Sequence, residues 1–378
     1  MKIILTGGGS GGHFYPLIAV AEKINEFVEE EKLLKPEIYF LSNSPYDKKK
    51  LRENNIIFKK ISAGKLRRYF SILNFFGLFK TGWGFIRSFF IVFNIFPDVV
   101  FSNGGNVSFP VLLTARIFRI PVMIHISDSV PGRTNAWAAK FAKKVSLGFP
   151  EASELLKTKK DKIAVLGNPV RNELMNILSE GASEFLGLSK SLPTVLVLGG
   201  SSGSAKINER VIDALPRLVE KYQVIHQVGK ASFGEVNNRA KVVLNGNEYE
   251  DRYRAFPYLN TLGMKMAAGI SSLIVSRAGA GSISEIAIWG LPSIIIPIPE
   301  KVSNDQRRNA FAFSRTGAAV VIEQENLTTS ILLSEIDRLM EDEAIRKEMG
   351  EKAKGFGKVD AAEKIAKGII NIALEHED

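Results

Sequence analysis

Residues 2–13 read KIILTGGGSGGH, and residues 194–204 read TVLVLGGSSGS. Each stretch is a short apolar segment typical of a buried strand, followed by a glycine loop and then by a helix-like segment, 16–28 in the first case and 205–218 in the second. Glycine lets backbone N–H groups come close to an anionic or polyhydroxylated ligand, and the helix N-terminus behind it favours negative charge. The repeated pattern predicts two nucleotide-binding halves that face one another across a cleft.

Strand-like and helix-like segments alternate along the whole chain, which favours an α/β fold with parallel sheets. We predict strands at 2–6, 37–41, 56–61, 98–102, 121–126, 144–148 and 162–166, then at 194–198, 223–228, 241–244, 254–256, 272–276, 293–297 and 319–322. The break at Asn168-Pro169 places a domain boundary there, which gives a first domain of 1–168 and a second of 169–357. Further helices are predicted at 329–341 and 344–377, and the stretch from about 358 to 378 is expected to pack back on the first domain.

The composition excludes several classes of protein. A chain of 378 residues, 45% hydrophobic and 24% charged, is long enough for two globular domains. It has no cysteine, which excludes disulfides and cysteine-based zinc sites. The histidines lack a metal-binding spacing and no D-x-D motif follows a strand, so we expect no metal and no cofactor. The first apolar run is too short for a signal peptide, and no run reaches the roughly 18 apolar residues of a spanning helix, so we expect a cytoplasmic protein.

Segment 61–96 is basic and aromatic, in a chain whose net charge is +10. It has no acidic residue and holds nine of the 24 phenylalanines, together with Lys65, Arg67, Arg68, Lys80, Trp83 and Arg87. Cationic charge interleaved with large aromatic rings is typical of a segment that lies on an anionic bilayer. We therefore predict peripheral attachment to an anionic membrane surface through 65–96. The alternative is a pair of core helices with a basic rim. Nucleic acid is not expected as a partner, because no known nucleic-acid-binding motif accompanies the aromatic residues.

Polar and glycine-rich motifs follow several predicted strands of the first domain. A dinucleotide fingerprint would need an acidic residue at the end of the second strand, but Ser42-Asn43 stands there, which argues against NAD or FAD. His13 at the end of the glycine loop is expected to contact substrate, the alternative being a core histidine. Gly104-Gly105-Asn106 follows the predicted strand at 98–102, at the same sheet edge as the first glycine loop, either as part of the site or as a structural turn. The polar stretch 125–135 begins at the end of the predicted strand at 121–126.

The second domain carries a similar motif at 276–285, SRAGAGSISE, which joins a strand to a helix. Small residues at the helix start allow a diphosphate to approach the free N–H groups. We expect Glu285 in the first turn, where it either accepts hydrogen bonds from a ribose diol or caps the helix. Asp305 and Gln306 follow a further strand and either bind sugar hydroxyls or belong to a solvated loop.

Six motifs, in order from Met1 to about Ala319, together resemble the MurG family of bacterial glycosyltransferases. They are G-G-x-S-G-G-H, G-G-x-V-S-x-P, H-x-x-D-x-x-x-G-x-T-N, G-N-P-V-R, G-G-S-x-G and S-x-x-G-x-x-x-x-S-E-I. The resemblance implies a GT-B fold of two Rossmann-like domains and inverting transfer of N-acetylglucosamine from UDP-N-acetylglucosamine. The implied acceptor is the C4 hydroxyl of polyprenyl-pyrophosphate-linked N-acetylmuramyl-pentapeptide (lipid I to lipid II). It also implies no nucleotide-bound metal and a place on the cytoplasmic face of the cell membrane, as a peripheral protein.

Carried over residue by residue, the resemblance implies a set of site residues. Donor binding falls to Ser10 (where the family commonly has Thr), Gly11, Gly12, Asp128, Arg171, Ser201, Leu259, Ala280, Gly281, Ser282, Ile283, Ser284, Glu285, Asp305 and Gln306. Within this set Leu259 matches a backbone site that reads uracil, and Arg171 and Ser201 match residues near the diphosphate. Acceptor binding falls to Gly104, Gly105, Asn106 and Asn135. The charge of the leaving UDP is then met by a helix dipole and Arg171.

One departure concerns catalysis. Where the family usually reads H-E-Q-N, this chain has His125-Ile126-Ser127-Asp128, so the family glutamate is replaced by Ile126. We expect His13 to be the catalytic base, because an unperturbed imidazole titrates near neutral pH. Asp128 either orients His13 or acts in its place. The open alternatives are another UDP-sugar-dependent lipid glycosyltransferase, a UDP-N-acetylglucosamine 2-epimerase and a non-catalytic nucleotide-sugar-binding module.

Overall fold

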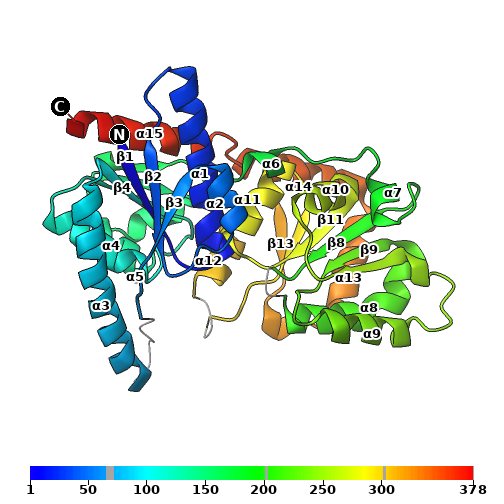
Figure 1. Ribbon diagram of the computed structural model, residues 1–378. Helices are drawn as coiled ribbons and strands as arrows, with labels where there is room; N and C mark the ends of the chain where they lie inside the picture. Colours follow the sequence, from blue (N-terminus) through cyan, green and yellow to red (C-terminus); the bar gives the residue numbers. More distant parts are fainter. Residues whose placement is uncertain (65–71, 201–202, 301–303, 378) are drawn as a thin grey trace. The chain divides into compact units, whose positions relative to one another are not determined.

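The computed structural model describes residues 1–64, 72–200, 203–300 and 304–377, and the chain divides into two compact units (Figure 1). The first unit is Met1–Arg171 together with Lys358–Asp378, and the second unit is Asn172–Gly357. The division follows Arg171, where the sequence placed a boundary after residue 168. Each unit contains one parallel sheet, which confirms the predicted α/β class with two Rossmann-like domains.

The first unit is built on a seven-stranded parallel sheet in the order β3-β2-β1-β4-β5-β6-β7. Its strands are β1 (Lys2–Thr6), β2 (Glu37–Ser42), β3 (Ile56–Lys60), β4 (Val99–Ser102), β5 (Val122–Ile126), β6 (Lys144–Leu147) and β7 (Ile163–Val165). Its helices are α1 (Gly11–Glu30), α2 (Lys48–Glu53), α3 (Ile72–Ile95), α4 (Ser108–Ile117), α5 (Arg133–Ala138) and α15 (Ala361–Glu377), with short 3₁₀ turns at Pro150–Leu155 and Lys160–Lys162.

Successive residues of β1 point to opposite faces of this sheet, as strand geometry requires. Ile3 and Leu5 enter a core that α1 and α15 cover, while Ile4 enters a second core beneath α3, α4 and α5. Helix α15 lies against α1, although almost the whole chain separates the two (Figure 1). The first unit therefore contains the last helix of the chain.

The second unit is built on a six-stranded parallel sheet in the order β10-β9-β8-β11-β12-β13. Its strands are β8 (Thr194–Leu198), β9 (Gln223–Gln227), β10 (Tyr253–Phe256), β11 (Ser271–Ser276), β12 (Ser293–Ile295) and β13 (Ala319–Val321). Its helices are α6 (Asn172–Met175), α7 (Ala182–Leu186), α8 (Ala205–Lys221), α9 (Phe233–Val243), α10 (Thr261–Ile270), α11 (Ala280–Trp289), α12 (Asn304–Ser314), α13 (Thr329–Glu341) and α14 (Glu343–Phe356), with 3₁₀ turns at Glu250–Arg252 and Gln324–Asn326.

All but one of the predicted strands are confirmed to within two residues at each end. The strand predicted at 241–244 is wrong, because these residues end helix α9 and continue just past it. Val236, Ala240 and Leu244 are buried at helical spacing, whereas Val242 is 76% exposed. A short apolar run does not by itself distinguish a buried strand from a helix end.

The single helix predicted at 344–377 is also wrong, because α14 ends at Phe356 and α15 begins at Ala361. Gly357 is extended (φ −63°, ψ 132°), and a Cβ at this position would lie 3.0 Å from the backbone carbon of Ala287. The close approach of two backbones explains why the helix stops at a glycine.

The strand order reverses beside β1 in the first sheet and beside β8 in the second. In doubly wound sheets the loops at the carboxyl ends of strands at this reversal hold ligands. The first glycine loop follows β1 and Gly104-Gly105 follows its neighbour β4. In the second unit, the second glycine loop follows β8 and the 277–279 stretch follows its neighbour β11.

Helix α3 has one buried and one exposed face. Ser88 and Val92 are buried, whereas the opposite face carries an aromatic stripe of Phe79, Trp83, Phe90 and Phe93, which are 57–66% exposed, with Ile86 (48%) between them. Lys80 and Arg87 are exposed beside it, while Lys65, Arg67 and Arg68 lie outside the described residues. The core-helix alternative therefore accounts for only one face of α3. Within the described residues, no helix has both the length and the apolar character that crossing a membrane requires.

Candidate active site

The first glycine loop ends in an open helix N-terminus that carries His13. Ser10 is the N-cap residue of α1 in extended conformation, and its hydroxyl makes no capping hydrogen bond. Ser10 and Gly12 are exposed, Gly11 is half-buried, and the first turn of α1 contains no acidic residue. The N–H groups of a first helical turn lack partners within the helix, so this end of α1 suits an oxygen-rich ligand.

The glycines of this loop have different roles. A Cβ on Gly8 would lie 2.8 Å from Cδ2 of His13, and a Cβ on Gly105 (φ +89°) would lie 2.7 Å from Cα of Gly8. The Gly8 N–H donates to the Gly104 carbonyl at 3.0 Å, which ties the two loops together. Gly12, in contrast, has open space at its Cβ position. Gly8 and Gly105 therefore make room for the imidazole, and Gly12 leaves room for a ligand.

The imidazole of His13 is half-buried and has a defined tautomer. Its Nδ1 lies 2.8 Å from the backbone oxygen of Asn103. A carbonyl oxygen only accepts hydrogen bonds, so Nδ1 carries the proton and Nε2 of the neutral ring has a free lone pair. The group that holds Nδ1 is thus the Asn103 carbonyl and not Asp128. Asp128 is half-buried on the loop that follows β5.

Asn103 is a site residue that the sequence analysis missed. It follows β4 directly, is 1% exposed, and bonds through its side chain to the backbone of the glycine loop and to Ser127. The signal was available, because an amide side chain directly after an apolar strand at the ligand-binding edge needs buried partners.

His125 is a core histidine. Its Nε2 lies 2.9 Å from Oδ1 of Asn168, its Nδ1 lies 3.0 Å from Oγ of Ser146, and burial lowers its pKa to about 4. The ring is therefore neutral at physiological pH and anchors the loop that carries Ser127 and Asp128.

The predicted acceptor residues are mostly close together. A Cβ on Gly104 (φ +77°) would lie 2.7 Å from Nδ2 of Asn135, and this Nδ2 donates to the His125 carbonyl at 3.1 Å. Within the described part of the chain, Oδ1 of Asn135 is buried and has no hydrogen-bond partner. An unsatisfied buried oxygen costs about 1–3 kcal/mol, which a ligand hydroxyl or amide would recover. Asn106 is exposed and Gly105 half-buried in the same turn.

Arg171 lies in the first unit, against α1. Its guanidinium carbon is 3.9 Å from the centre of the Tyr15 ring, a cation–π contact two residues from His13 along the helix. The structure thus places Arg171 near the first glycine loop, on the unit that carries His13.

In the second unit, Gln227 connects the second glycine loop to the predicted uracil site. Its Nε2 donates to the Gly200 carbonyl at 3.3 Å, and its Oε1 accepts the backbone N–H of Leu259 at 2.9 Å. Gly200 (φ +82°) has open space at its Cβ position, and Leu259 is buried. Ser201 lies outside the described residues. Gln227 had no predicted role, although it ends a buried strand at the same sheet edge.

Helix α11 begins at Ala280 with no side-chain cap and no acidic residue in its first turn. Its N-cap residue is Gly279, and Gly281 has open space at its Cβ position. The expectation that Glu285 lies in the first turn is wrong, and so is the capping alternative, because Glu285 is the sixth helical residue. Ile283 is fully buried, and Ser284 Oγ donates to the Ala280 carbonyl at 2.8 Å. The groups of this stretch that suit a diphosphate are therefore the backbone N–H groups of Ala280, Gly281 and Ser282.

Arg277 adds positive charge beside this helix start. Its guanidinium donates to four neutral oxygens in the described structure: the carbonyls of Ile296 and Pro297, Oγ of Ser204 and Oε1 of Gln324. Burial lowers its pKa to about 10, so the side chain stays charged at neutral pH. The sequence analysis quoted this residue within the 276–285 motif but gave it no role.

The remaining predicted donor residues belong to the start of α12. Gln306 Oε1 accepts the backbone N–H of Ile298 at 3.3 Å, so the side-chain oxygen of Gln306 is engaged in this hydrogen bond. Asp305 lies in the first turn of α12, and its side chain is outside the described residues. Asn309 Nδ2 donates to the Ala278 carbonyl at 3.2 Å and so ties α12 to the loop before α11.

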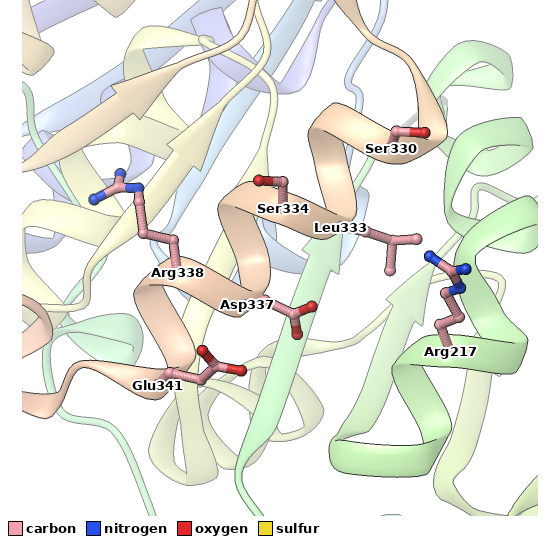
Figure 2. Close-up of a pocket in the computed structure, with 7 residues that line it drawn as sticks. All are labelled: Arg217, Ser330, Leu333, Ser334, Asp337, Arg338 and Glu341. Atoms are coloured by element: carbon pink, nitrogen blue, oxygen red, sulfur yellow. The ribbon is translucent and has the colours of Figure 1, made fainter.

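A separate pocket of about 550 Å³ lies between helices α8 and α13 of the second unit (Figure 2). It is lined by Arg217, Ser330, Leu333, Ser334, Asp337, Arg338 and Glu341. None of the predicted site residues lines it, so it is not the candidate active site.

Comparison with family models gives two matches. Residues 3–147 match the glycosyltransferase family 28 N-terminal domain, and residues 194–365 match the glycosyltransferase family 28 C-terminal domain. Together the two models span the second sheet, both glycine loops and the first sheet as far as β6.

Curated relatives match over nearly the whole chain. A protein of Halothermothrix orenii is 35% identical over 95% of this chain and 95% of its own length, and one of Legionella pneumophila (strain Paris) is 39% identical over 90% and 89%. Both are named UDP-N-acetylglucosamine–N-acetylmuramyl-(pentapeptide) pyrophosphoryl-undecaprenol N-acetylglucosamine transferase.

Two solved structures have the same fold. The crystal structure of Acinetobacter baumannii MurG superposes with a TM-score of 0.72 at 23% identity, covering 98% of this chain and 99% of that one. UDP-GlcNAc 2-epimerase from Neisseria meningitidis, solved with UDP-GlcNAc bound, superposes with a TM-score of 0.68 at 14% identity, covering 98% and 100%. At these identities the superpositions establish the GT-B fold alone.

Proposed function

This chain belongs to glycosyltransferase family 28, among the MurG-type N-acetylglucosaminyltransferases, and from that premise we propose that it converts lipid I to lipid II. It moves N-acetylglucosamine from UDP-N-acetylglucosamine to the C4 hydroxyl of lipid-linked N-acetylmuramyl-pentapeptide, a step of peptidoglycan synthesis. The substrates follow from the names of relatives that are 34–39% identical over at least nine-tenths of this chain.

The reaction is a direct displacement with inversion. The C4 oxygen forms a bond to the anomeric carbon while the bond from that carbon to the β-phosphate oxygen breaks, and UDP leaves. The proton of the C4 hydroxyl passes to Nε2 of His13. The observation that carries this step is the 2.8 Å hydrogen bond from Nδ1 to the Asn103 carbonyl, because it leaves Nε2 as the proton acceptor. A general base of this kind contributes about 10²–10⁴-fold to the rate.

The UDP part of the donor binds the second unit. The backbone N–H groups at the start of α11 receive the diphosphate, with the charge of Arg277 at the same sheet edge, and the Leu259 carbonyl reads the uracil. Glu285 accepts from the ribose hydroxyls, and Asp305 and Gln306 hold the sugar. Oriented N–H groups and the half-buried guanidinium of Arg277 stabilise the charge that develops on UDP, and we expect the reaction to need no metal and no cofactor.

The acceptor binds the first unit, at Gly104, Gly105, Asn106 and Asn135. Support comes from the unsatisfied Oδ1 of Asn135 beside Gly104. The aromatic stripe of α3, with Lys80 and Arg87, attaches the enzyme to the anionic cytoplasmic face of the membrane, where its lipid-linked acceptor resides.

The alternative chemistries are less well supported. A 2-epimerase shares the fold, but the relatives cited above, at 35% and 39% identity, carry the transferase name. A transferase acting on a different lipid would use the same donor unit and the same membrane stripe.

The test is incubation of the enzyme with UDP-[¹⁴C]N-acetylglucosamine and a lipid I analogue in detergent, followed by lipid extraction. We expect label in the lipid phase only when the muramyl lipid is present. Label transferred to diacylglycerol, or conversion of the free nucleotide sugar to its C2 epimer, would contradict the proposal.

A further inference from the structure

Asn103 contacts His13 with both its backbone and its side chain. Its carbonyl accepts the Nδ1–H of His13 at 2.8 Å, and its Nδ2 donates to the His13 carbonyl at 3.1 Å. The two hydrogen bonds run in opposite directions between the same two residues. Together they fix the distance between the end of β4 and the first turn of α1.

The orientation of the Asn103 amide is determined by its partners. One end of the amide faces two carbonyl oxygens, those of His13 and Gly12, which only accept hydrogen bonds. This end is therefore the NH₂ group. The other end, Oδ1, lies 2.8 Å from the hydroxyl of Ser127, which donates to it. Every polar atom of this buried side chain has a partner, as a rigid network requires.

The surroundings of the ring leave it little freedom. Gly8 and Gly105 lie beside Cδ2 of the His13 ring, and the Asn103 N–H donates to the Thr6 carbonyl at 3.0 Å, which anchors Asn103 to β1. Rotation of the imidazole away from Asn103 would break the Nδ1 hydrogen bond.

We propose that Asn103, braced by Ser127, is a positioning residue that fixes His13 in the Nδ1–H tautomer and so makes Nε2 the proton acceptor. The catalytic consequence rests on the proposed function, whereas the tautomer is a property of the protein alone. A neutral imidazole carries its proton on either nitrogen, and only one of the two forms presents a basic Nε2.

The direct test is ¹⁵N NMR of the full-length chain with labelled histidine, at a pH where the ring is neutral. The chain has four histidines, and His13→Gln identifies the His13 signals. Protonated and unprotonated ring nitrogens have widely separated ¹⁵N shifts. We expect an unprotonated Nε2 in the wild type and a mixture of tautomers in Asn103→Leu. The variant keeps the backbone carbonyl that accepts Nδ1–H, but it removes the side-chain hydrogen bonds to the Gly12 and His13 carbonyls, so the first turn of α1 is no longer held at the distance that this bond requires.

The activity readout separates positioning from folding. Asn103→Leu should lower kcat roughly 10- to 100-fold, part of what a general base supplies, with the KM for UDP-N-acetylglucosamine changed less than twofold. The matched control is Asn54→Leu, since Asn54 is also buried in the first unit and donates to a backbone carbonyl, that of Lys50, away from His13. The control should lower the melting temperature and leave the His13 tautomer and kcat unchanged.

Two results would overturn the proposal: a protonated Nε2 in wild-type His13, or the same tautomer in Asn103→Leu as in the wild type. Should Asn103→Leu fail to fold, Ser127→Ala decides, because it removes only the donor to Oδ1. A fraction of Nε2–H tautomer in that variant supports the proposal, and an unchanged tautomer opposes it. If the wild type transfers no sugar to the lipid I analogue, the proposed function fails, and the NMR result still decides the role of Asn103.

Discussion

Leu259 donates its backbone N–H to Oε1 of Gln227 at 2.9 Å, so the predicted uracil-reading residue is held by a side chain from the neighbouring strand. The N–H of Leu259 is engaged in this bond, and its carbonyl is the group left to read a base. Because the other end of the same amide holds the Gly200 carbonyl, one glutamine connects the base-reading loop to the second glycine loop.

Gln227→Leu should weaken UDP binding about tenfold, because it frees the Leu259 loop and leaves the buried N–H of Leu259 without its partner, a loss worth about 1–3 kcal/mol. The Gly200 carbonyl still accepts the Gly203 N–H at 3.1 Å. Isothermal titration with UDP measures the loss of affinity. Gln223→Leu is the matched control, since Gln223 is equally buried at the opposite end of β9 and bonds to Ser189, Leu192 and Thr194. Equal losses of UDP affinity in both variants would mean that Gln227 acts through stability alone.

His13→Ala should lower kcat about 10²–10⁴-fold with little change in the donor KM, because the base acts on the acceptor hydroxyl. Asp128→Ala should have a smaller effect on kcat. Single-turnover transfer with labelled donor measures both. Near-normal kcat in His13→Ala together with loss of activity in Asp128→Ala would reverse the assignment and make Asp128 the base.

Gly8→Ala should displace the His13 ring, since the new Cβ would lie 2.8 Å from Cδ2. We expect kcat to fall at least tenfold while UDP affinity is kept, because the UDP part of the donor binds the second unit. Gly82→Ala is the contrasting variant, with open space at its Cβ and a position inside α3 where alanine is favoured by about 1 kcal/mol. The idea that Gly8 accommodates the imidazole is untenable if Gly8→Ala keeps full kcat.

Stability should fall as the pH drops below about 6.5. Burial lowers the pKa of His125 to about 4 and that of His226 to about 3, both from 6.5. At a pH between 6.5 and the lowered pKa, a histidine of the unfolded chain takes up a proton that the same histidine of the native chain does not. The contribution of these histidines to the free energy of unfolding is therefore complete above pH 6.5 and is lost progressively toward pH 4. For His125 the loss is roughly 3 kcal/mol. Melting curves from pH 8 to pH 4 measure the slope, and His226→Gln should make it shallower.

Replacing Phe79, Trp83 and Phe90 by serine should release the protein from liposomes that contain anionic lipid. These side chains are 60–66% exposed on one face of α3, and each aromatic ring removed from the bilayer interface weakens binding. Flotation at low salt should show at least tenfold weaker binding with UDP affinity unchanged. Val242→Ser, which removes a 76% exposed side chain from the second unit, is the control. Wild-type protein that stays unbound at low salt would contradict membrane attachment.

The sequence predicted the fold well because buried parallel strands appear as short apolar runs between turn signals. It was wrong where local pattern and packing disagree. Val242, Val243 and Leu244 look like a strand, yet Val236, Ala240 and Leu244 are the residues that turn toward the core. Gly357 ends α14 because of a backbone neighbour in α11, which no local pattern contains.

The sequence predicted the site residues that bear charge or lie in glycine loops. It missed site residues whose role depends on hydrogen bonds to partners far away in the sequence. His13 is conspicuous after five glycines, but the Asn103 carbonyl that sets its tautomer is 90 residues away. Gln227 and Arg277 are likewise defined by long-range hydrogen bonds, to Leu259 and to Ser204. The glycines were interpreted as room for a ligand, whereas Gly8 makes room for a side chain.

The position of α15 has a consequence for synthesis of the chain on the ribosome. Ile365, Ile369 and Ile372 complete the core that begins with Ile3 and Leu5, so the part of that core which α15 covers stays exposed while the whole second unit is translated. The nascent first unit therefore exposes apolar surface that invites chaperones, and its final closure waits for α15 to emerge. A truncation before Lys358 should yield an aggregation-prone first unit beside a second unit that still folds.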